Sequence, residues 1–189
     1  NQGYTIGYAD QVRQVFSKAN IKLALSGHIH AQSIKHKTVN GQELTDIASG
    51  ALILGEHYYG TLVINQDTGA AQYHATPLNV SHYIQQHQGA KAVKAFQKYD
   101  HDVLYASGYN AALSSLYEDR DETHYSSKKI KTLATGMGEA NIAMFRGTSV
   151  KQTAAVDAWN RMPDSIGLKK FILRTKDLHG NLQWSGQVR

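Results

Sequence analysis

The spacing of apolar residues changes near Pro77, and this change restricts the folds that the chain can adopt. Before Pro77, short apolar runs alternate with glycine-rich turns, a pattern typical of strands joined by tight connections. After it, apolar residues recur at helical spacings almost to the C-terminus. We therefore predict an α+β chain with two domains, a mixed one over residues 1–78 and an all-α helical one over residues 79–189.

The first domain is predicted to begin with a helix and a strand. Residues 9–19 carry apolar side chains on one helical face, and after Asn20 the run IKLALS is expected to form a buried strand. The pair Asn40 and Gly41 separates AQSIKHKTV from QELTDIAS, which is the strongest hairpin signal in the chain. A second hairpin is predicted for YYGTLVIN and AAQYHATP across the turn QDTG.

The second domain is predicted to consist of helices. The clearest helical patterns cover residues 81–99, 105–116, 130–144 and 166–172. Gly89 weakens the middle of the first of these, and a further helix is expected to run through Trp159. The tail, LHGNLQWSGQVR, is rich in turn residues, and we expect at most a small terminal hairpin there.

The absence of cysteine from the 189 residues excludes several kinds of chemistry. Disulfides, thiolate metal sites and cysteine nucleophiles cannot occur, and the redox compartment is left open. A metal site would have to use histidine, aspartate, asparagine and glutamate, which favours zinc, manganese or iron.

The chain is basic, with a formal net charge of +5, which would suit a polyanionic partner. The basic residues are scattered, however, and the densest cluster, SSKKIK at 126–131, is interpreted as a solvated helix face. We therefore expect no nucleic-acid polymer as a partner. No apolar run is long enough to span a membrane. Localisation stays open, since a secreted or cell-surface protein would carry its export signal upstream of these residues.

The stretch KLALSGHIH, residues 22–30, has the strongest chemical signature. Two histidines at i and i+2 project to one side of an extended segment, and open α/β sheets bind ligands where their strands end. Gly27 would let the backbone turn sharply and approach a ligand closely. Among ten histidines an accidental H-x-H is not negligible. The position after a strand and a glycine nevertheless favours a metal site to which His28 and His30 contribute.

SGHIHAQ, with a helix and strand before it and a hairpin and DIASGAL after it, resembles the last signature of the calcineurin-like metallophosphoesterases. That family carries a G-H-x-H motif at this place and a tight turn like that of Ser49, Gly50 and Ala51. The match covers about residues 4–78. By architecture alone, the helical region resembles the bacterial cyclic-nucleotide phosphodiesterase branch of the family.

The resemblance implies a fold and an activity. Residues 1–78 would form the C-terminal half of a metallophosphoesterase α/β sandwich, with Gly27 as the motif's glycine. His28 and His30 would each bind one ion of a manganese, iron or zinc pair that activates water for attack on a phosphoester or nucleotide. The family's D-x-H, G-D-x-x-D and G-N-H motifs should all precede residue 1. The parent protein would thus be the phosphodiesterase, and this C-terminal fragment should be inactive and bind metal weakly or not at all.

Other readings of the same residues stay open. His57, in the loop GEHYYG, is a candidate for the edge of the site, whereas the D-x-H of residues 177–179 is interpreted as a solvated turn. One alternative is a non-catalytic helical module that docks a protein or a polyanion. Another is a mononuclear zinc protein that uses His28, His30 and a third histidine such as His57. An exposed sheet edge would also favour self-association.

Overall fold

The computed structural model describes residues 6–28, 30–118, 125–164, 166–176, 178 and 181–189, and these form a mixture of helices and strands. The chain divides into two compact units. The first, called here the mixed unit, comprises Asn1–Leu78 together with Gly180–Arg189. The second, the helical unit, comprises Asn79–His179. The coarse α+β prediction is confirmed, and the first boundary falls where the change of pattern near Pro77 predicts it.

The first sheet of the mixed unit contains the predicted hairpin. It consists of β1 (Leu23–Ser26), β2 (Ser33–Val39) and β3 (Gln42–Ala48), in the order β1-β3-β2. Strands β2 and β3 are antiparallel, and Asn40 and Gly41 between them have φ of 51° and 78°, as a type I′ turn requires. Strand β1 runs parallel to β3, so the carboxyl ends of β1 and β3 lie at the same edge of the sheet.

The C-terminal tail forms a strand of the second sheet, which differs from the small terminal hairpin that was predicted. It consists of β4 (Tyr58–Ile64), β5 (Ala70–Pro77) and β6 (Gln183–Gln187), in the order β4-β5-β6. The β4–β5 hairpin was predicted, but β6 pairs with β5 from far along the chain and forms no terminal hairpin. The second domain therefore does not extend over all of residues 79–189. Strand β6 belongs to the mixed unit because its backbone groups complete the ladder of β5 and Trp184 packs against the unit's core.

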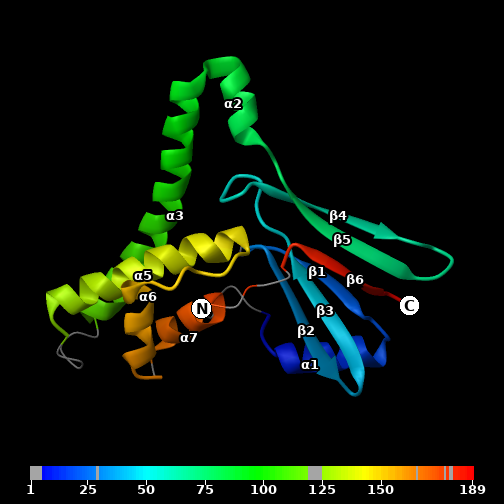
Figure 1. The fold of residues 1–189 in the computed structure, drawn as a ribbon. Helices are drawn as coiled ribbons and strands as arrows, with labels where there is room; N and C mark the ends of the chain where they lie inside the picture. The colour runs from blue at the N-terminus through cyan, green and yellow to red at the C-terminus, as the bar shows by residue number, and fades with distance from the viewer. Residues whose placement is uncertain (1–5, 29, 119–124, 165, 177, 179–180) are drawn as a thin grey trace. The chain divides into compact units, whose positions relative to one another are not determined.

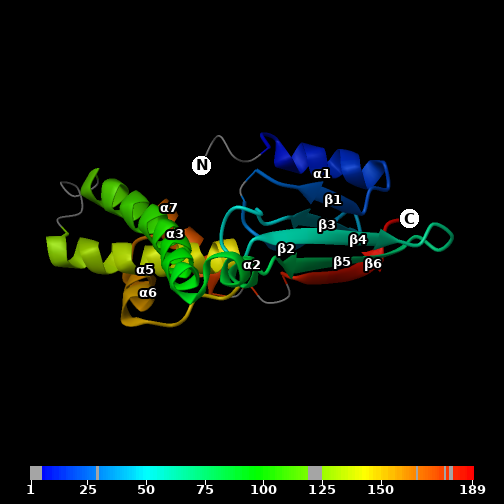
Figure 2. The same cartoon turned by 90° about the horizontal axis from the view of Figure 1, so that it is seen from above.

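The two sheets of the mixed unit pack on a common core. Its buried members are Ile34 and Ile47 from the first sheet and Tyr58, Tyr73 and Ala75 from the second. Helix α1 (Ala9–Lys18) contacts β2 and β3, and Figure 2 shows it on the side of the first sheet away from the second. The loops that follow β1 and β3 leave the same edge of the first sheet.

The helical unit contains α2 (Val80–Gln88), α3 (Ala90–Glu118), α5 (Ser127–Arg146), α6 (Ala154–Ala158), the 3₁₀ helix η1 (Trp159–Arg161) and α7 (Gly167–Thr175). Figure 1 shows α2 beside the N-terminal half of α3. The helix predicted over residues 81–99 is interrupted at Gly89, whose φ is 81°, and the rest of it continues without a break into the next predicted helix. With φ of 81° and ψ of 175°, Gly89 adopts backbone that is essentially restricted to glycine, and it ends one helix just before the next begins.

The core of the helical unit is built on close contact between helices. Gly108 of α3 and Gly136 of α5 lie so close to neighbouring backbone that an added Cβ would meet carbonyl oxygens at 2.7 Å and 2.5 Å. Trp159 is fully buried, and its Nε1 donates to the carbonyl oxygen of Leu133 at 2.8 Å. The helix that was predicted to run through Trp159 therefore ends with its indole fixed in this core.

Candidate functional site

The GHIH stretch and the turn at residues 49–51 lie at the same edge of the first sheet. Ser26, the last residue of β1, is paired in parallel with Ala48, the last residue of β3. The backbone nitrogen of Ser49 donates to the carbonyl oxygen of Ser26 at 3.3 Å, which keeps the two exits together. The sequence-based expectation that the histidines follow the carboxyl end of a strand agrees with this register.

The backbone at the two motif histidines is left-handed. His28 has φ of 71° and His30 has φ of 57°, and both side chains are exposed. Ile29 lies outside the described residues. The expected extended geometry, in which positions i and i+2 share a face, is therefore wrong, because neither histidine has extended backbone. A side chain in left-handed backbone costs about 1–2 kcal/mol relative to the helical region, and such strain is concentrated at functional sites.

Gly27 does not have left-handed backbone, and an added Cβ would find no atom within 4 Å. Positive φ occurs instead at His28 and His30. The space beside Gly27 is open, so a ligand or another polypeptide segment could approach its backbone.

His57 lies at the end of the loop that joins β3 to β4, and its backbone is also left-handed, with φ of 55°. Its side chain is only 8% exposed, and Nδ1 lies 2.8 Å from the carbonyl oxygen of Leu52. A carbonyl can only accept, so this contact places a proton on Nδ1 and, in the neutral ring, the lone pair on Nε2. Histidines that bind metals are commonly held in this way by a backbone carbonyl.

The three histidines that the sequence singles out share this unusual backbone. In the described part of the chain six residues other than glycine have positive φ. They are Tyr8, Asn20, His28, His30, Asn40 and His57. Positive φ is uncommon for residues other than glycine, although asparagine and histidine adopt it more often than most, as Asn40 does in its hairpin turn. Three of the six are the candidate site residues.

A buried polar network joins Gln32, directly before β2, to the turn at residues 49–51. Gln32 is fully buried, and its Oε1 accepts hydrogen bonds from the Gly50 nitrogen at 3.1 Å and the Tyr73 hydroxyl at 3.3 Å. Its Nε2 donates to the carbonyl oxygen of Asn181 at 2.7 Å. The hydroxyl of Tyr73 lies 3.3 Å from Ser49 Oγ. The residue after GHIHA thus ties the histidine loop to the turn at 49–51.

Sequence reasoning missed the residues of this network. Gln32, Tyr73 and Asn181 are uncharged, belong to no catalytic pattern and come from distant parts of the chain. The one available signal was the place of Gln32 in SGHIHAQ, directly before the predicted strand that contains Ile34. Because a buried amide needs partners, its position implied a network whose other members could not be named.

The remaining histidines on the strands are surface residues. His36 on β2 is exposed, with Nδ1 at 3.1 Å from Thr45 Oγ1 and 3.7 Å from Glu43 Oε1. His74 on β5 is also exposed. Both belong to hairpin faces, away from the loops that follow β1 and β3. They serve as matched histidines against which the behaviour of His28 and His30 can be measured.

The imidazoles of His28 and His30 fit a metal ion only as part of a larger set of ligands. Among the described residues, no three histidine, aspartate or glutamate side chains lie close enough together to hold one ion. His28 and His30 are imidazoles of the type that zinc, manganese and iron accept, and both are accessible from outside. His28 and His30 could therefore supply two of the ligands that a metal site needs. Residues 177 and 179, the D-x-H of the tail, lie outside the described residues.

Comparison with known proteins does not assign this chain to a family. No protein-family model matches the chain, and no curated protein is significantly similar to it. Within the described residues, no helix combines the length and the apolar character that crossing a membrane would require.

Proposed function

We propose that His28 and His30 are ligands of a dinuclear metal centre, and that this chain is the C-terminal part of a metallophosphoesterase that cleaves phosphodiesters such as cyclic nucleotides. The observation that carries the proposal is the left-handed backbone of both histidines at the shared carboxyl end of β1 and β3. Strain of this kind persists where the surrounding structure enforces it. The resemblance of SGHIHAQ to the family's G-H-x-H signature is the second support.

The residues of this chain would act by binding and orientation. His28 and His30 would each present a neutral imidazole nitrogen to one cation, from the loop that leads to the buried Gln32. When bound, a pair of divalent ions lowers the pKa of water and polarises a phosphoryl oxygen. The family resemblance implies that the further ligands would come from the D-x-H, G-D-x-x-D and G-N-H motifs, which would precede residue 1.

The proposal has a direct spectroscopic test with the chain as it is. Paramagnetic Mn²⁺, titrated at sub-stoichiometric concentration, should broaden the ring proton resonances of His28 and His30 before those of His36 and His74. Equal broadening of all four rings would contradict the proposal. Loss of the effect at position 28 in the variant His30→Asn would show that the two rings act together.

The parent protein provides the second test. Its coding sequence upstream of residue 1 should contain D-x-H, G-D-x-x-D and G-N-H motifs in that order. The protein that includes them should hydrolyse bis(p-nitrophenyl) phosphate with Mn²⁺, and His30→Asn should reduce kcat/KM by about a hundredfold or more, the scale expected when metal charge stabilisation is lost. Absence of the motifs would instead favour a non-catalytic helical binding module.

A mononuclear zinc site is the second candidate, and the hydrogen bond at His57 is the observation that favours it. In that case His28, His30 and His57 would bind one ion after a rearrangement of their loops, since they form no such group in the structure described. Elemental analysis of the dialysed chain decides the matter. One equivalent of zinc that disappears in His57→Ala would support this alternative, and no retained zinc would exclude it.

A further inference from the structure

A basic hollow of about 420 Å³ lies in the helical unit, where the N-terminus of α5 meets α6 and η1. It is lined by Ser126, Lys128, Lys129, Thr132, Ala158 and Arg161. The sequence run SSKKIK was interpreted as a solvated helix face. Lys128 and Lys129 are exposed, in agreement with that interpretation, and the fold adds Arg161 from a separate element to the same hollow.

Positive charge in this hollow is not neutralised by the described residues. Lys128 and Arg161 form no ion pair within that part of the chain, and Lys129 Nζ lies over the ring of Tyr125, 3.9 Å from its centroid. The two carboxylates on the nearby segment are engaged elsewhere: Asp164 lies 2.7 Å from Lys169 Nζ, and Asp157 lies 3.9 Å from Lys176 Nζ. Three like charges around one concavity repel one another, and an anion placed between them removes that repulsion.

The start of α5 adds to the same potential. This helix is 20 residues long, and Ser126 caps it by accepting a hydrogen bond from the Lys129 nitrogen at 3.2 Å. The amides of its first turn have no carbonyl partner four residues earlier within the helix, and they carry the positive end of the helix dipole. Backbone amides and cationic side chains together form the usual binding chemistry for phosphate.

We propose that this hollow binds a small phosphorylated ligand that carries two or more negative charges. Its volume is within the range of small-molecule sites and larger than a single phosphate ion needs, which favours a diphosphate or a phosphate ester. Lys128 and Lys129 would bind the phosphate oxygens as point charges, and the planar guanidinium of Arg161 would bind two of them at once. This proposal is independent of any activity at His28 and His30.

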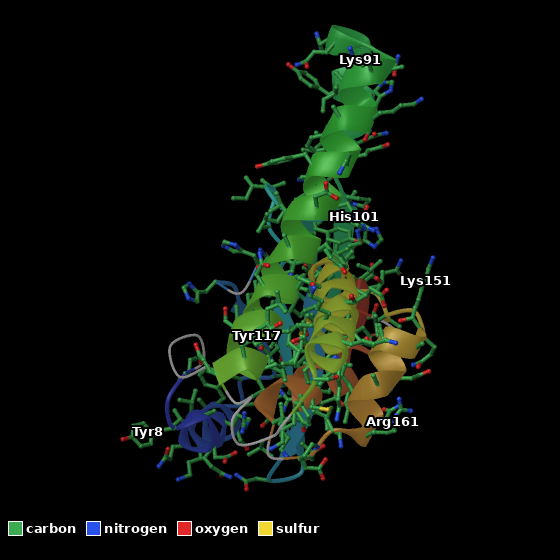
Figure 3. All side chains as sticks on the ribbon, turned by 90° about the vertical axis from the view of Figure 1, so that its left-hand side faces the viewer. Tyr8, Lys91, His101, Tyr117, Lys151 and Arg161 are labelled. Atoms are coloured by element: carbon green, nitrogen blue, oxygen red, sulfur yellow. The ribbon has the colours of Figure 1, made fainter. Side chains whose placement is uncertain are left out.

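The test uses the whole chain and compares two exposed cations. Arg161→Gln removes a cation from the hollow, and Lys151→Gln removes one outside it. Figure 3 shows these side chains at separate places on the helical unit, Lys151 in the segment before α6 and Arg161 after it. Both are exposed, so both variants should fold, and the fluorescence of buried Trp159 checks that they do.

Amide shifts in a ¹⁵N-labelled sample are followed during titration with pyrophosphate, with orthophosphate, and with sodium chloride at matched ionic strength. Pyrophosphate should shift the amides of Lys128 and Lys129 and saturate. Arg161→Gln should weaken its binding about tenfold, the scale of one charge-assisted hydrogen bond, whereas Lys151→Gln should weaken it less than about twofold. Equal shifts with chloride, or equal weakening in the two variants, would overturn the proposal.

A second pair of probes identifies the source of the phosphate. A nucleoside monophosphate and its uncharged nucleoside are titrated under the same conditions. Binding of the monophosphate together with no binding of the nucleoside would assign the hollow to phosphate esters. Binding of pyrophosphate alone would assign it to inorganic polyphosphates. Saturable binding of the nucleoside by itself would contradict an anion site.

Discussion

Gln32 Nε2 donates a hydrogen bond of 2.7 Å to the carbonyl oxygen of Asn181, a residue 149 positions further along the chain. The side chain of Asn181 accepts in turn from the backbone nitrogen of Ile34 at 2.8 Å. Both residues are buried. Asn181, shortly before β6, is therefore bonded to residues at the start of β2, shortly after the GHIH stretch.

Replacement of this buried amide should be costly. Gln32→Leu removes one donor and one acceptor and leaves the Asn181 carbonyl and the Gly50 nitrogen without their partners, which should lower the free energy of unfolding by about 2–3 kcal/mol. Gln42→Leu is the matched control, because Gln42 Nε2 donates to the Ile21 carbonyl at 3.0 Å in an exposed setting. The control should cost less than about 1 kcal/mol. Urea unfolding followed at Trp184 reports on the mixed unit, and similar costs for the two variants would contradict the network.

The strained histidines should not contribute to stability. His28→Asn and His30→Asn should be as stable as the wild type or more stable by about 0.5 kcal/mol, because asparagine accepts left-handed backbone more readily. The same substitution at His36, on strand β2, should destabilise by about 0.5–1 kcal/mol through lower strand propensity and the lost contact with Thr45. Thermal unfolding compares the three. A large loss of stability at position 28 or 30 would show that these histidines serve the fold and would weaken the ligand proposal.

Two glycines of the helical unit should respond in opposite ways to one methyl group. In Gly136→Ala the new Cβ would lie 2.5 Å from the Ala155 carbonyl oxygen, which is backbone and cannot move aside, so a loss of about 2–3 kcal/mol is expected. Gly167, the first residue of α7, has open space around its Cβ position, and Gly167→Ala should gain about 0.5 kcal/mol. Unfolding followed at Trp159 measures both. A neutral result for Gly136→Ala would mean that α5 and α6 are less closely packed than described.

Acid should remove the contribution that the ion pair of Asp164 and Lys169 makes to the stability of the fold. The hydrogen bond from Lys169 Nζ to Asp164, and secondarily the charge of Lys169, hold the pKa of Asp164 below its ordinary value of 3.8. A carboxylate whose pKa is lowered by folding stabilises the folded state above its unfolded pKa, and this stabilisation is lost as the pH falls through the folded value. Asp164→Asn should therefore be slightly less stable than the wild type at neutral pH, and the difference should vanish on acidification below 3.8. It should also shrink at about 1 M salt, because Asp164 is exposed. A difference that grows in acid would show that the ion pair does not stabilise the fold.

Several features were predictable because they depend on neighbours in sequence. The hairpin at Asn40 and Gly41 follows from the left-handed backbone that these two residue types accept. The switch to helices after Pro77 follows from apolar spacing, and the division of the chain at Leu78 agrees with it. The placement of His28 and His30 after β1 follows from a short apolar run and a glycine. Each of these is a local preference that packing did not override.

Other features could not be predicted because no local pattern encodes them. Strand β6 is short and polar, and only the free edge of β5 makes it a strand. In the sequence Arg161 is one of many scattered basic residues, and only the fold brings it to the hollow that Lys128 and Lys129 also line. The left-handed backbone of His30 contradicts the extended segment that its neighbours favour. For β6 the pairing with β5, a contact between distant residues, outweighs the local preference.

The sequence by itself determined the order of elements, the division near Pro77 and the chemical character of the GHIH stretch, because these depend on residue type and on spacing over a few positions. The tertiary structure alone decided that the last residues complete the second sheet, that Gln32 is bonded to Asn181 and Gly50, and that three cations border one hollow. The physical reason is that hydrogen-bond partners and charge neighbours are chosen by proximity in space. That proximity arises only after distant segments have packed together.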